Sequence, residues 1–410
     1  IEIWNTQLKA VKDVINKSKI DPNEIDSIGI TNQRETTIIW DKQTGKPVYN
    51  AIVWQDRRTA SFCDELIEKN KTSLIQQKTG LVIDAYFSGT KIRWILDNNQ
   101  ELREKANDNK LLFGTVDTWL IWNLTNGKSH ITDPSNASRT LLYNIKDDKW
   151  DKELLELFGV PENILPKVVD SSSVSTNIDK EILGVEIPIS GIAGDQQAAL
   201  FGQLCINEGD IKNTYGTGCF CMMNTGENFV MSKNKMLSTI AWRINGEITY
   251  ALEGSIFVAG ALIQWLRDQL GIIKSSPEVE ELAKTVIDNG GLTFVPALSG
   301  LAAPYWDPYV QGTIFGITRG TENGHIARAA LESIALRTRD IVVEMEKDAG
   351  IKFKDLKVDG GASNNNLLMQ IQANLLSTNV VRPKTTETTA LGVAFLAGLA
   401  TGFWKDISDL

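Results

Sequence analysis

The spacing of apolar and polar residues predicts alternating helices and strands along the whole chain. Trp4, Leu8, Val11 and Ile15 share one helical face, which predicts an amphipathic first helix that ends near 21–22. Alternating or β-branched runs bounded by turn residues predict strands. By these criteria we expect strands at 28–30, 37–40, 187–194, 212–215, 219–224, 239–242, 248–250, 356–358 and 380–381, and helices at 90–96, 101–110, 195–200, 256–270, 325–347, 364–376 and 390–400. Both halves of the chain therefore belong to the α/β or α+β class.

The length and composition are those of an ordinary soluble protein with more than one domain. At about 150 residues per domain, 410 residues correspond to two or three domains. Hydrophobic residues at 42% and charged residues at 23% argue against intrinsic disorder and coiled coil. The formal net charge of -9 has the wrong sign for a protein that coats nucleic-acid phosphates, so no nucleic-acid partner is expected.

Cysteines and histidines are too few and too scattered for several kinds of site. The 4 cysteines include no C-x-x-C pair and are too sparse for a disulfide framework, which indicates a reducing, cytoplasmic compartment. His130 and His325 stand far apart and lack zinc-binding spacing. The longest apolar stretch, 390–404, is shorter than the roughly 20 residues that span a bilayer, so no transmembrane segment is expected. Because the chain starts with neither Met nor a signal peptide, we expect it to begin partway into a longer protein.

The common nucleotide-binding and hydrolase motifs are incomplete in this chain. Residues 127–129 match the last three positions of the phosphate-loop motif, but Trp122 stands where the motif requires its first glycine. The turn at 216–218 begins a dinucleotide fingerprint, but Cys221 replaces its third glycine. Ser363 has no nearby histidine to act as its base. Chemistry must therefore rest on other residues.

Polar residues at predicted turns are the remaining candidates, and each has two interpretations. Arg34 and Glu35 follow a predicted strand, where they either grip hydroxyl groups or form a salt-bridged strand end. Asp195 begins a predicted helix as either a general base or a helix N-cap. The glycine turns at 216–218 and 359–361 either receive phosphate oxygens or are simply tight turns.

Seven motifs in order along the chain closely resemble the glycerol kinases, a branch of the FGGY family of carbohydrate kinases. The resemblance runs from about residue 3 to residue 404, which is nearly the whole chain. The matching segments are Ile30-Thr-Asn-Gln-Arg-Glu-Thr-Thr37, Trp54-Gln-Asp-Arg-Arg-Thr59, Gly114-Thr-Val-Asp-Thr-Trp-Leu120, Ile192-Ala-Gly-Asp-Gln-Gln-Ala-Ala199, Asn213-Thr-Tyr-Gly-Thr-Gly-Cys219, Ala303-Pro-Tyr-Trp-Asp-Pro308 and Val358-Asp-Gly-Gly-Ala362.

The resemblance implies an α/β fold of two ribonuclease H-like domains of the actin-type ATPase kind, with the active site in the cleft between them. Residues 1–202 would be the N-terminal, glycerol-binding domain, and residues 203–410 the C-terminal, nucleotide-binding domain. The implied activity is that of an ATP:glycerol 3-phosphotransferase, which forms sn-glycerol 3-phosphate with ATP and Mg²⁺. The family commonly forms homo-oligomers, so a dimer or tetramer is expected.

The resemblance also implies a role for individual residues. Asp195 would be the general base that accepts the proton of the attacking hydroxyl. The residues implied to bind glycerol are Arg34, Glu35, Tyr86, Asp195 and Gln196, with Trp54 and Phe220 packed against its carbon chain. The residues implied to bind the nucleotide are Thr217, Gly260, Gln264, Gly361 and Asn365.

Two parts of the family pattern have no match in this chain. The family's N-terminal strand and hairpin, which handle the transferred phosphate and the metal, would precede Ile1, and the chain also stops before the family's last helices. No metal ligand is therefore assigned, and whether the chain is active by itself stays open. The residues are also compatible with a xylulose- or gluconate-type FGGY kinase, with a non-catalytic binding fragment, and with an actin-like assembly protein that shares only the fold.

Overall fold

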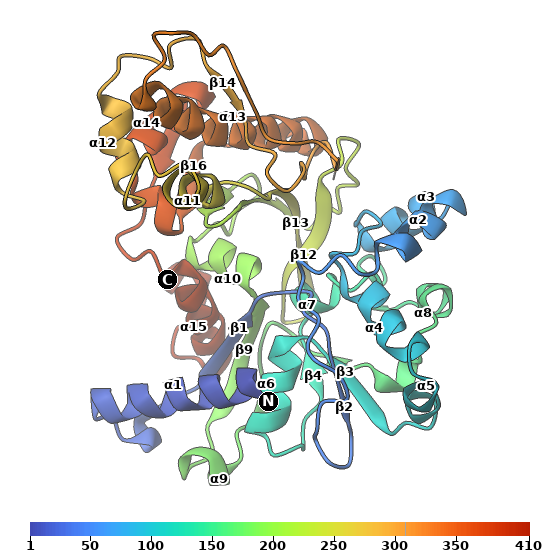
Figure 1. The fold of residues 1–410 in the computed structure, drawn as a ribbon. Coiled ribbons are helices and arrows are strands. Elements are labelled where there is room, and N and C mark those ends of the chain that lie inside the picture. Colours follow the sequence, from blue (N-terminus) through green and yellow to red (C-terminus); the bar gives the residue numbers. More distant parts are fainter. Residues whose placement is uncertain (308) are drawn as a thin grey trace. The chain divides into compact units, whose positions relative to one another are not determined.

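The computed structural model describes residues 1–307 and 309–410, and these fold into two compact units. Unit 1 contains Ile1–Leu204, Thr239–Tyr250 and Thr389–Leu410, and unit 2 contains Cys205–Ser238 and Ala251–Thr388 (Figure 1). The chain thus leaves unit 1 after Leu204 and returns to it twice, with residues 239–250 and residues 389–410. The domain division at residue 202 lies two residues from that break and stays a prediction.

The elements of unit 1 occur mainly in the first half of the chain. Its helices are α1 (Glu2–Ser18), α2 (Ala60–Glu68), α3 (Thr72–Thr79), α4 (Ser88–Asp97), α5 (Gln100–Asn107), α6 (Val116–Leu124), α7 (Pro134–Ala137), α8 (Lys152–Phe158), α9 (Lys180–Leu183), α10 (Asp195–Gly202) and α15 (Thr388–Thr401). Its strands are β1 (Ile28–Asn32), β2 (Ile38–Asp41), β3 (Leu111–Gly114), β4 (Ile131–Thr132), β5 (Tyr143–Asn144), β6 (Lys149–Trp150), β7 (Lys167–Val168), β8 (Ser172–Asn177) and β9 (Pro188–Gly194).

Unit 2 has fewer and longer elements. Its helices are α11 (Gly260–Asp268), α12 (Glu278–Lys284), α13 (Asn323–Ala349) and α14 (Asn366–Leu376), and its strands are β10 (Ile211–Tyr215), β11 (Cys219–Gly226), β14 (Thr293–Val295), β15 (Thr313–Phe315), β16 (Asp355–Asp359) and β17 (Asn379–Val381). The hairpin of β12 (Leu237–Ile244) and β13 (Glu247–Ile256) contributes residues to both units.

Parallel pairing of β1 with β9 organises unit 1. The register places Ile30 opposite Ile192 and Asn32 opposite Gly194, so the two strands end at the same level. Helix α10 starts immediately after β9, and a loop follows β1. The carboxyl ends of parallel strands are where α/β proteins place ligand-binding residues.

Helix α15 packs directly on this sheet because glycines remove the side chains that would separate them. A Cβ atom on Gly29 would lie 2.6 Å from the carbonyl oxygen of Val393, and one on Gly191 would lie 2.7 Å from the amide nitrogen of Ala397. Close approach of helix and strand is a recognised use of glycine. Although α15 is apolar, no helix in the described ranges is long and apolar enough to cross a membrane.

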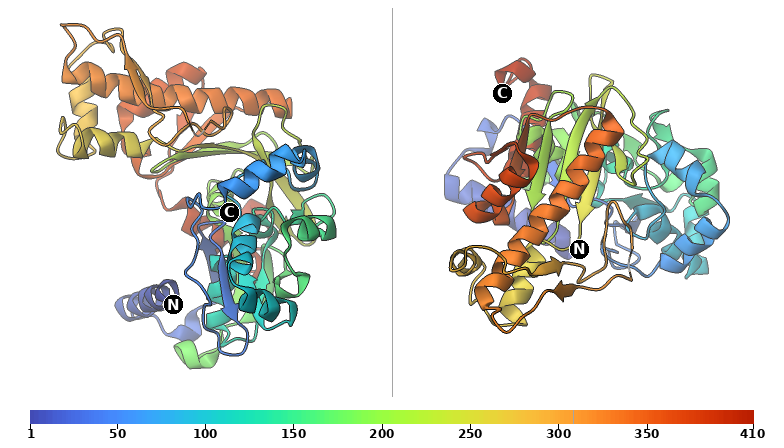
Figure 2. Two further views of the ribbon diagram at one scale, coloured as in Figure 1. Left: turned by 45° about the vertical axis from the view of Figure 1, so that its right-hand side comes forward. Right: turned by 90° about the horizontal axis from the view of Figure 1, so that it is seen from above.

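In unit 2, β10 lies between an antiparallel and a parallel neighbour. It pairs with β11 on one side and with β16 on the other, and β17 extends the parallel part. Helix α13 packs against this sheet and against α14 (Figure 2). The apolar core between them includes Ile211, Leu252, Leu331, Ile334, Ile341 and Leu356.

The expected α/β class is confirmed, and most expected elements are present within a few residues of their expected bounds. The helix expected from residue 256 begins only at Gly260, because β13 continues to Ile256. The sequence pattern does not indicate helices α2, α3, α6, α7, α8, α9 and α12. Helix α6 is buried on almost every side, so it lacks the polar face that makes a helix recognisable.

His130 is partly buried among aromatic rings in unit 1. Its Nε2 atom lies 2.7 Å from the carbonyl oxygen of Phe113, and its ring centroid is 5.6 Å from that of Trp40 and 6.3 Å from that of Trp122. Burial lowers the pKa of His130 to about 4. The folded state therefore holds the neutral ring, whereas the unfolded state takes up a proton below about pH 6.5.

We predict that His130 makes the fold sensitive to acid. Between about pH 6.5 and about pH 4 the unfolded state binds more protons, so the free energy of unfolding falls with the pH by up to about 3 kcal/mol from this group. His130→Gln should flatten this part of the pH dependence in urea unfolding at pH 7 and pH 4.5. An unchanged slope in His130→Gln would contradict the prediction.

Candidate active site

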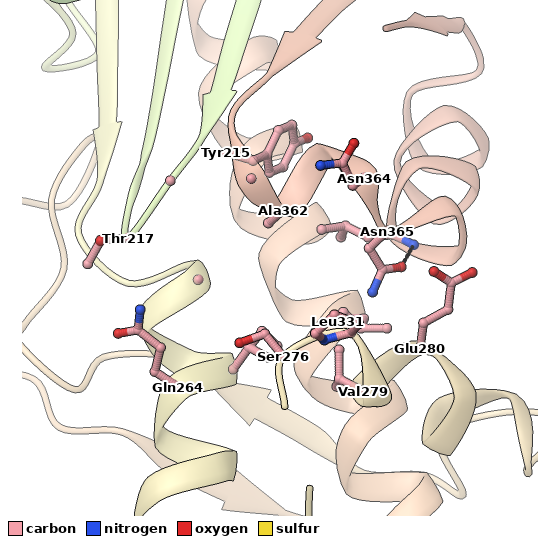
Figure 3. Close-up of a pocket in the computed structure, with 16 residues that line it drawn as sticks. Tyr215, Thr217, Gln264, Ser276, Val279, Glu280, Leu331, Ala362, Asn364 and Asn365 are labelled. Carbon is pink, nitrogen blue, oxygen red and sulfur yellow. Dashed lines mark hydrogen bonds between the residues drawn. The ribbon is translucent and has the colours of Figure 1, made fainter. Parts of the chain in front are cut away.

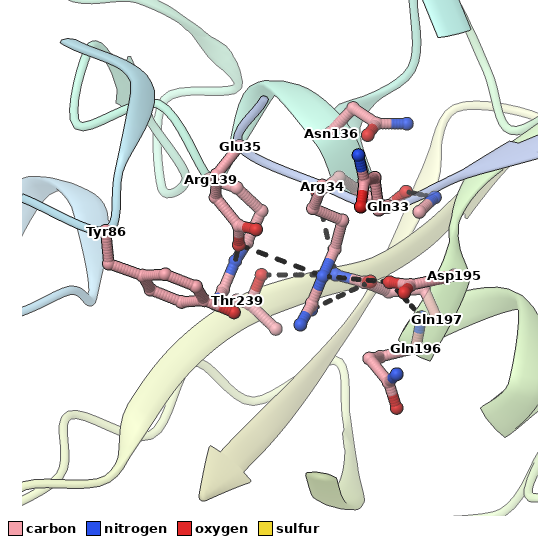
Figure 4. A network of polar contacts seen from close by, with 12 residues as sticks. Gln33, Arg34, Glu35, Tyr86, Asn136, Arg139, Asp195, Gln196, Gln197 and Thr239 are labelled. Carbon is pink, nitrogen blue, oxygen red and sulfur yellow. Dashed lines mark hydrogen bonds and ion pairs between the residues drawn. The ribbon is translucent and has the colours of Figure 1, made fainter. Parts of the chain in front are cut away.

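Arg34 and Asp195 meet where β1 and β9 end. Arg34 lies just beyond β1, and its Nε atom is 3.3 Å from Oδ1 of Asp195, while its Nη1 atom donates a hydrogen bond of 3.1 Å to Oε1 of Gln197 (Figure 4). The register that places Asn32 opposite Gly194 makes this contact possible. An ion pair thus links the loop after β1 to the first turn of α10.

Gly194 allows Arg34 to reach this position. A Cβ atom on Gly194 would lie 2.7 Å from both Cγ and Cδ of Arg34 and 3.0 Å from Oε1 of Gln197. Any larger residue would displace the aliphatic part of the arginine side chain. The glycine before Asp195 therefore has a packing role beside its place in the turn.

Glu35 is the buried carboxylate of the site. Its side chain is 2% exposed, and its Oε1 atom accepts a hydrogen bond of 2.7 Å from Nε of Arg139 and lies 3.8 Å from Nε of Arg34. Arg139 is itself fully buried. Since buried charges are costly unless paired, Glu35 between two arginines forms a self-consistent network. Of the two interpretations of Arg34 and Glu35, the salt-bridged strand end is therefore present in the structure.

An aromatic cluster borders this network. The rings of Trp54 and Tyr86 meet edge to face with centroids 5.5 Å apart, and Tyr86 is 6% exposed. The guanidinium carbon of Arg139 lies 5.7 Å from the Tyr86 ring centroid and 5.3 Å from that of Phe87. The site therefore combines a fixed set of charges with apolar ring surface, a combination typical of small-molecule sites.

Asp195 is the solvent-accessible member of the network. Its side chain is 33% exposed, against 2% for Arg34. The N-cap of α10 is Gly194, so the N-cap interpretation of Asp195 is wrong; its Oδ1 atom instead accepts a hydrogen bond of 2.8 Å from the backbone N–H of Gln196. A carboxylate is favoured in the first turn of a helix by the helix dipole. Asp195 is therefore held by polar contacts and still meets solvent, where a substrate can reach it.

Some participants were missed by the sequence reasoning. Gln197, the second glutamine of the Asp195-Gln-Gln motif, holds Arg34 in place. Its Nε2 atom donates a hydrogen bond of 3.2 Å to the carbonyl oxygen of Ile240, and its Oε1 atom accepts one from Arg34. Arg139 gave no local signal, because it is paired to a residue 104 positions away. Of the residues expected to hold glycerol, Phe220 alone belongs to unit 2, where it lies on β11.

Unit 2 contains a pocket of about 380 Å³ that brings together every residue expected to bind the nucleotide (Figure 3). The pocket lies among the β10–β11 turn, α11, α12, α13 and the start of α14. Apolar walls include Ile263, Leu331 and Leu368. The expected residues in its lining are Thr217, Gly260, Gln264, Gly361 and Asn365.

The glycine turn at 216–218 is tied to the first turn of α11. The amides of Ala259 and Ala261 donate to the carbonyl oxygen of Thr217 at 2.9 and 3.0 Å, and the amide of Gly260 donates to that of Gly216 at 3.0 Å. A Cβ atom on Gly260 would lie 2.5 Å from the Gly216 oxygen. These contacts hold one wall of the pocket in a fixed shape.

The turn that leads into α14 forms another part of the lining. Gly360 has a φ of +82° and would place a Cβ atom 2.5 Å from the carbonyl oxygen of Tyr215, whereas a Cβ on Gly361 would meet no atom within 4 Å. Oδ1 of Asn365 caps α14 by accepting a hydrogen bond of 2.8 Å from the amide of Leu368. Together the two turns border a partly apolar space between stretches of backbone.

The described residues contain no group of three or more His, Cys, Asp and Glu placed to hold a metal ion. Mg²⁺ is commonly bound through substrate phosphates together with only one or two carboxylates. Asp195 is a partly exposed carboxylate of the unit 1 network.

Family models cover nearly all of the chain. The model of the FGGY family of carbohydrate kinases, N-terminal domain, matches residues 1–202, and that of the C-terminal domain matches residues 211–401. The chain belongs to the FGGY carbohydrate kinases. The two-domain, actin-like ATPase type of fold expected from the sequence is thereby confirmed for this FGGY kinase.

Relatives with high identity to this FGGY kinase are glycerol kinases. It is 62% identical to glycerol kinase 2 of Thermotoga maritima over 100% of this chain and 83% of the relative. It is also 62% identical to the glycerol kinase of Thermoanaerobacter sp. over 100% of this chain and 82% of the relative. The expected resemblance is confirmed, and these relatives are longer than this chain.

Solved structures agree with this assignment. The crystal structure of Plasmodium falciparum glycerol kinase with ADP has a TM-score of 0.92 and 40% identity, covering 99% of this chain and 81% of that chain. A gluconate kinase from Lactobacillus acidophilus has a TM-score of 0.87 at 23% identity, covering 98% of this chain and 81% of that chain. At that identity the second comparison shows the fold alone.

Proposed function

We propose that this FGGY kinase transfers the γ-phosphoryl group of ATP to glycerol and forms sn-glycerol 3-phosphate. The observation that carries the proposal is the Arg34–Glu35–Asp195 network at the adjacent ends of β1 and β9. It offers charged donors, a buried carboxylate and an accessible carboxylate to a small polyol. Identity of about 60% to glycerol kinases along the whole chain supports the same activity.

The residues of unit 1 would bind and orient the acceptor alcohol. Arg34 and Gln196 would donate hydrogen bonds to its hydroxyl oxygens, and Glu35 would accept one from a hydroxyl. The rings of Trp54 and Tyr86 would pack against its carbon atoms, and so would Phe220 of unit 2. This set of contacts suits a short chain with several hydroxyl groups.

Asp195 would be the general base. As the terminal hydroxyl oxygen of glycerol bonds to the γ-phosphorus, the bond from that phosphorus to the β–γ bridging oxygen breaks, ADP leaves, and the hydroxyl proton passes to Asp195. The Arg34 guanidinium holds the Asp195 carboxylate in place at 3.3 Å. Such transfer depends mainly on positioning and charge neutralisation, so it needs no histidine.

The nucleoside of ATP would occupy the pocket of unit 2, with Thr217 near the phosphates and Gly361 and Asn365 around the nucleoside. Gly260 and Gln264 would line the helix side of the same pocket. Mg²⁺, when bound to the nucleotide, would neutralise the charge of the transferred phosphate. Formation of a homo-oligomer and a cytoplasmic location remain predictions.

The activity is tested by ADP release with Mg-ATP and one acceptor at a time. We expect release with glycerol that exceeds release with xylulose, with gluconate and without acceptor. The xylulose and gluconate reactions address the possibility of another FGGY kinase. Preference for either sugar would replace the proposed substrate, whereas absence of release with all acceptors in a chain that binds ATP would indicate a binding protein.

Asp195→Asn should lower kcat by about 100- to 10,000-fold, because the amide keeps the shape and the hydrogen bond from Gln196 but accepts no proton. Glycerol binding, measured by calorimetry, should change only a few-fold. Asp64→Asn, on the exposed face of α2, is the control and should leave kcat unaltered. Near-normal turnover of Asp195→Asn would remove Asp195 from the base role.

Asn365 allows the nucleotide contact to be separated from helix capping. Asn365→Asp keeps a good N-cap for α14, so stability should stay near that of the wild type, but the KM for ATP should rise several-fold because an amide donor becomes an anion. Asn365→Ala loses both roles and should also lower the free energy of unfolding by about 1 kcal/mol. Unchanged KM values for ATP in both variants would place the nucleotide elsewhere.

A further inference from the structure

Glu35 occupies an unfavourable backbone conformation. Its φ of +61° lies in the left-handed region, which is costly for residues other than glycine, and the amide of Thr36 donates a hydrogen bond of 2.7 Å to the carbonyl oxygen of Arg34 across it. A turn of this kind persists only where its surroundings hold it. In this conformation the Glu35 side chain points toward Arg139, and the Glu35 carbonyl oxygen points toward Ser88 and Lys91.

The surroundings that hold this turn are found at the Glu35 carbonyl oxygen. Ser88 Oγ donates to it at 3.0 Å, Lys91 Nζ at 3.3 Å and Thr37 Oγ1 at 3.3 Å. Two of these three donors lie in the first turns of α4 and are 0% exposed. The Glu35 carbonyl oxygen thus accepts hydrogen bonds from two side chains of α4, which lies more than fifty positions away in the sequence.

Lys91 also holds a second residue expected to bind the acceptor. Its Nζ atom donates a hydrogen bond of 2.6 Å to the carbonyl oxygen of Tyr86. One ammonium group therefore joins the backbone at Glu35 to the backbone at Tyr86. The two side chains also have a common neighbour in Arg139, which donates to the Glu35 carboxylate and lies over the Tyr86 ring.

Packing alone does not explain a lysine at this place. The two acceptors of Lys91 Nζ are backbone carbonyl oxygens, and full burial of an ammonium group is unfavourable, so an aliphatic residue would fill the same space at lower cost. Burial lowers the pKa of Lys91 to about 8, so the ammonium form still predominates at pH 7. The ammonium group donates hydrogen bonds to two separate backbone segments, which an aliphatic side chain could not do.

We propose that Lys91 is a positioning residue for the acceptor site, which fixes the Glu35 turn and Tyr86 at one mutual spacing and so sets the affinity for the acceptor alcohol. This inference rests on the proposed function, since it takes Glu35 and Tyr86 as acceptor-binding residues. Lys91 contacts the backbone of Glu35 and of Tyr86, and it acts on the acceptor only by holding these two residues in place.

The first test is Lys91→Met, which keeps the length of the side chain and removes its donors. We expect the KM for glycerol to rise about tenfold or more, because charged hydrogen bonds to both carbonyl oxygens are lost, while the KM for ATP stays within about twofold. Ser88→Ala, a milder change at the same carbonyl oxygen, should raise the KM for glycerol by about two- to fivefold and is informative if Lys91→Met does not fold.

Lys78→Met is the matched control for a general loss of stability. Lys78 is a partly buried lysine of the same unit that pairs with Asp151 and Glu153 rather than with the acceptor-binding loops. It should lower stability and leave the KM for glycerol unaltered. Equal increases in both KM values for Lys91→Met, or an equal rise in the KM for glycerol for Lys78→Met, would overturn the positioning role.

Hydrogen exchange separates this inference from the proposed function. In Lys91→Met, amides at 34–37 and 86–88 should exchange faster than in the wild type, and those of α11 should not change. Wild-type protein that shows no glycerol-dependent turnover would refute the proposed function, and exchange would then decide alone whether Lys91 holds the two loops. Unchanged exchange at both loops would refute the role of Lys91 in either case.

Discussion

The register of β1 against β9 is the constraint on which the candidate acceptor site depends. Parallel pairing with Asn32 opposite Gly194 ends both strands at one level, so residues 34–35 lie beside residues 195–197 although about 160 positions separate them. A shift by one residue would turn the side chains of β1 to the other face of the sheet. The missing side chain of Gly194 then lets Arg34 lie against the turn and reach Asp195.

Burial is distributed unevenly over the charges that this register brings together. Arg34 and Arg139 are almost fully buried with Glu35 between them, and Asp195, which keeps a third of its side chain exposed, supplies the second carboxylate that balances the two arginines. The buried charges hold one another in place, and the accessible carboxylate is left for chemistry. Preorganised charges of this kind need not rearrange during a reaction.

The local parts of this arrangement were accessible from the sequence, and the long-range parts were not. The strand at 187–194 followed by a helix at Asp195, and the glycine turns of unit 2, could be predicted because periodicity and turn chemistry are local properties. The motifs also identified Arg34 and Glu35 correctly as residues at a strand end. Arg139 and Lys91 escaped notice, since their importance arises from partners 104 and 56 positions away. Lone basic residues in a helix or a loop carry no pattern of their own.

Helix α15 gives the chain an order of assembly that differs from its order of synthesis. Residues 1–204 leave the ribosome first, but the sheet surface around Gly29 and Gly191 has its native cover only when residues 389–401 have been made. Unit 2 is by then already translated. Unit 1 is therefore completed only after unit 2 has been made, and until then the strands around Gly29 and Gly191 lack the helix that covers them.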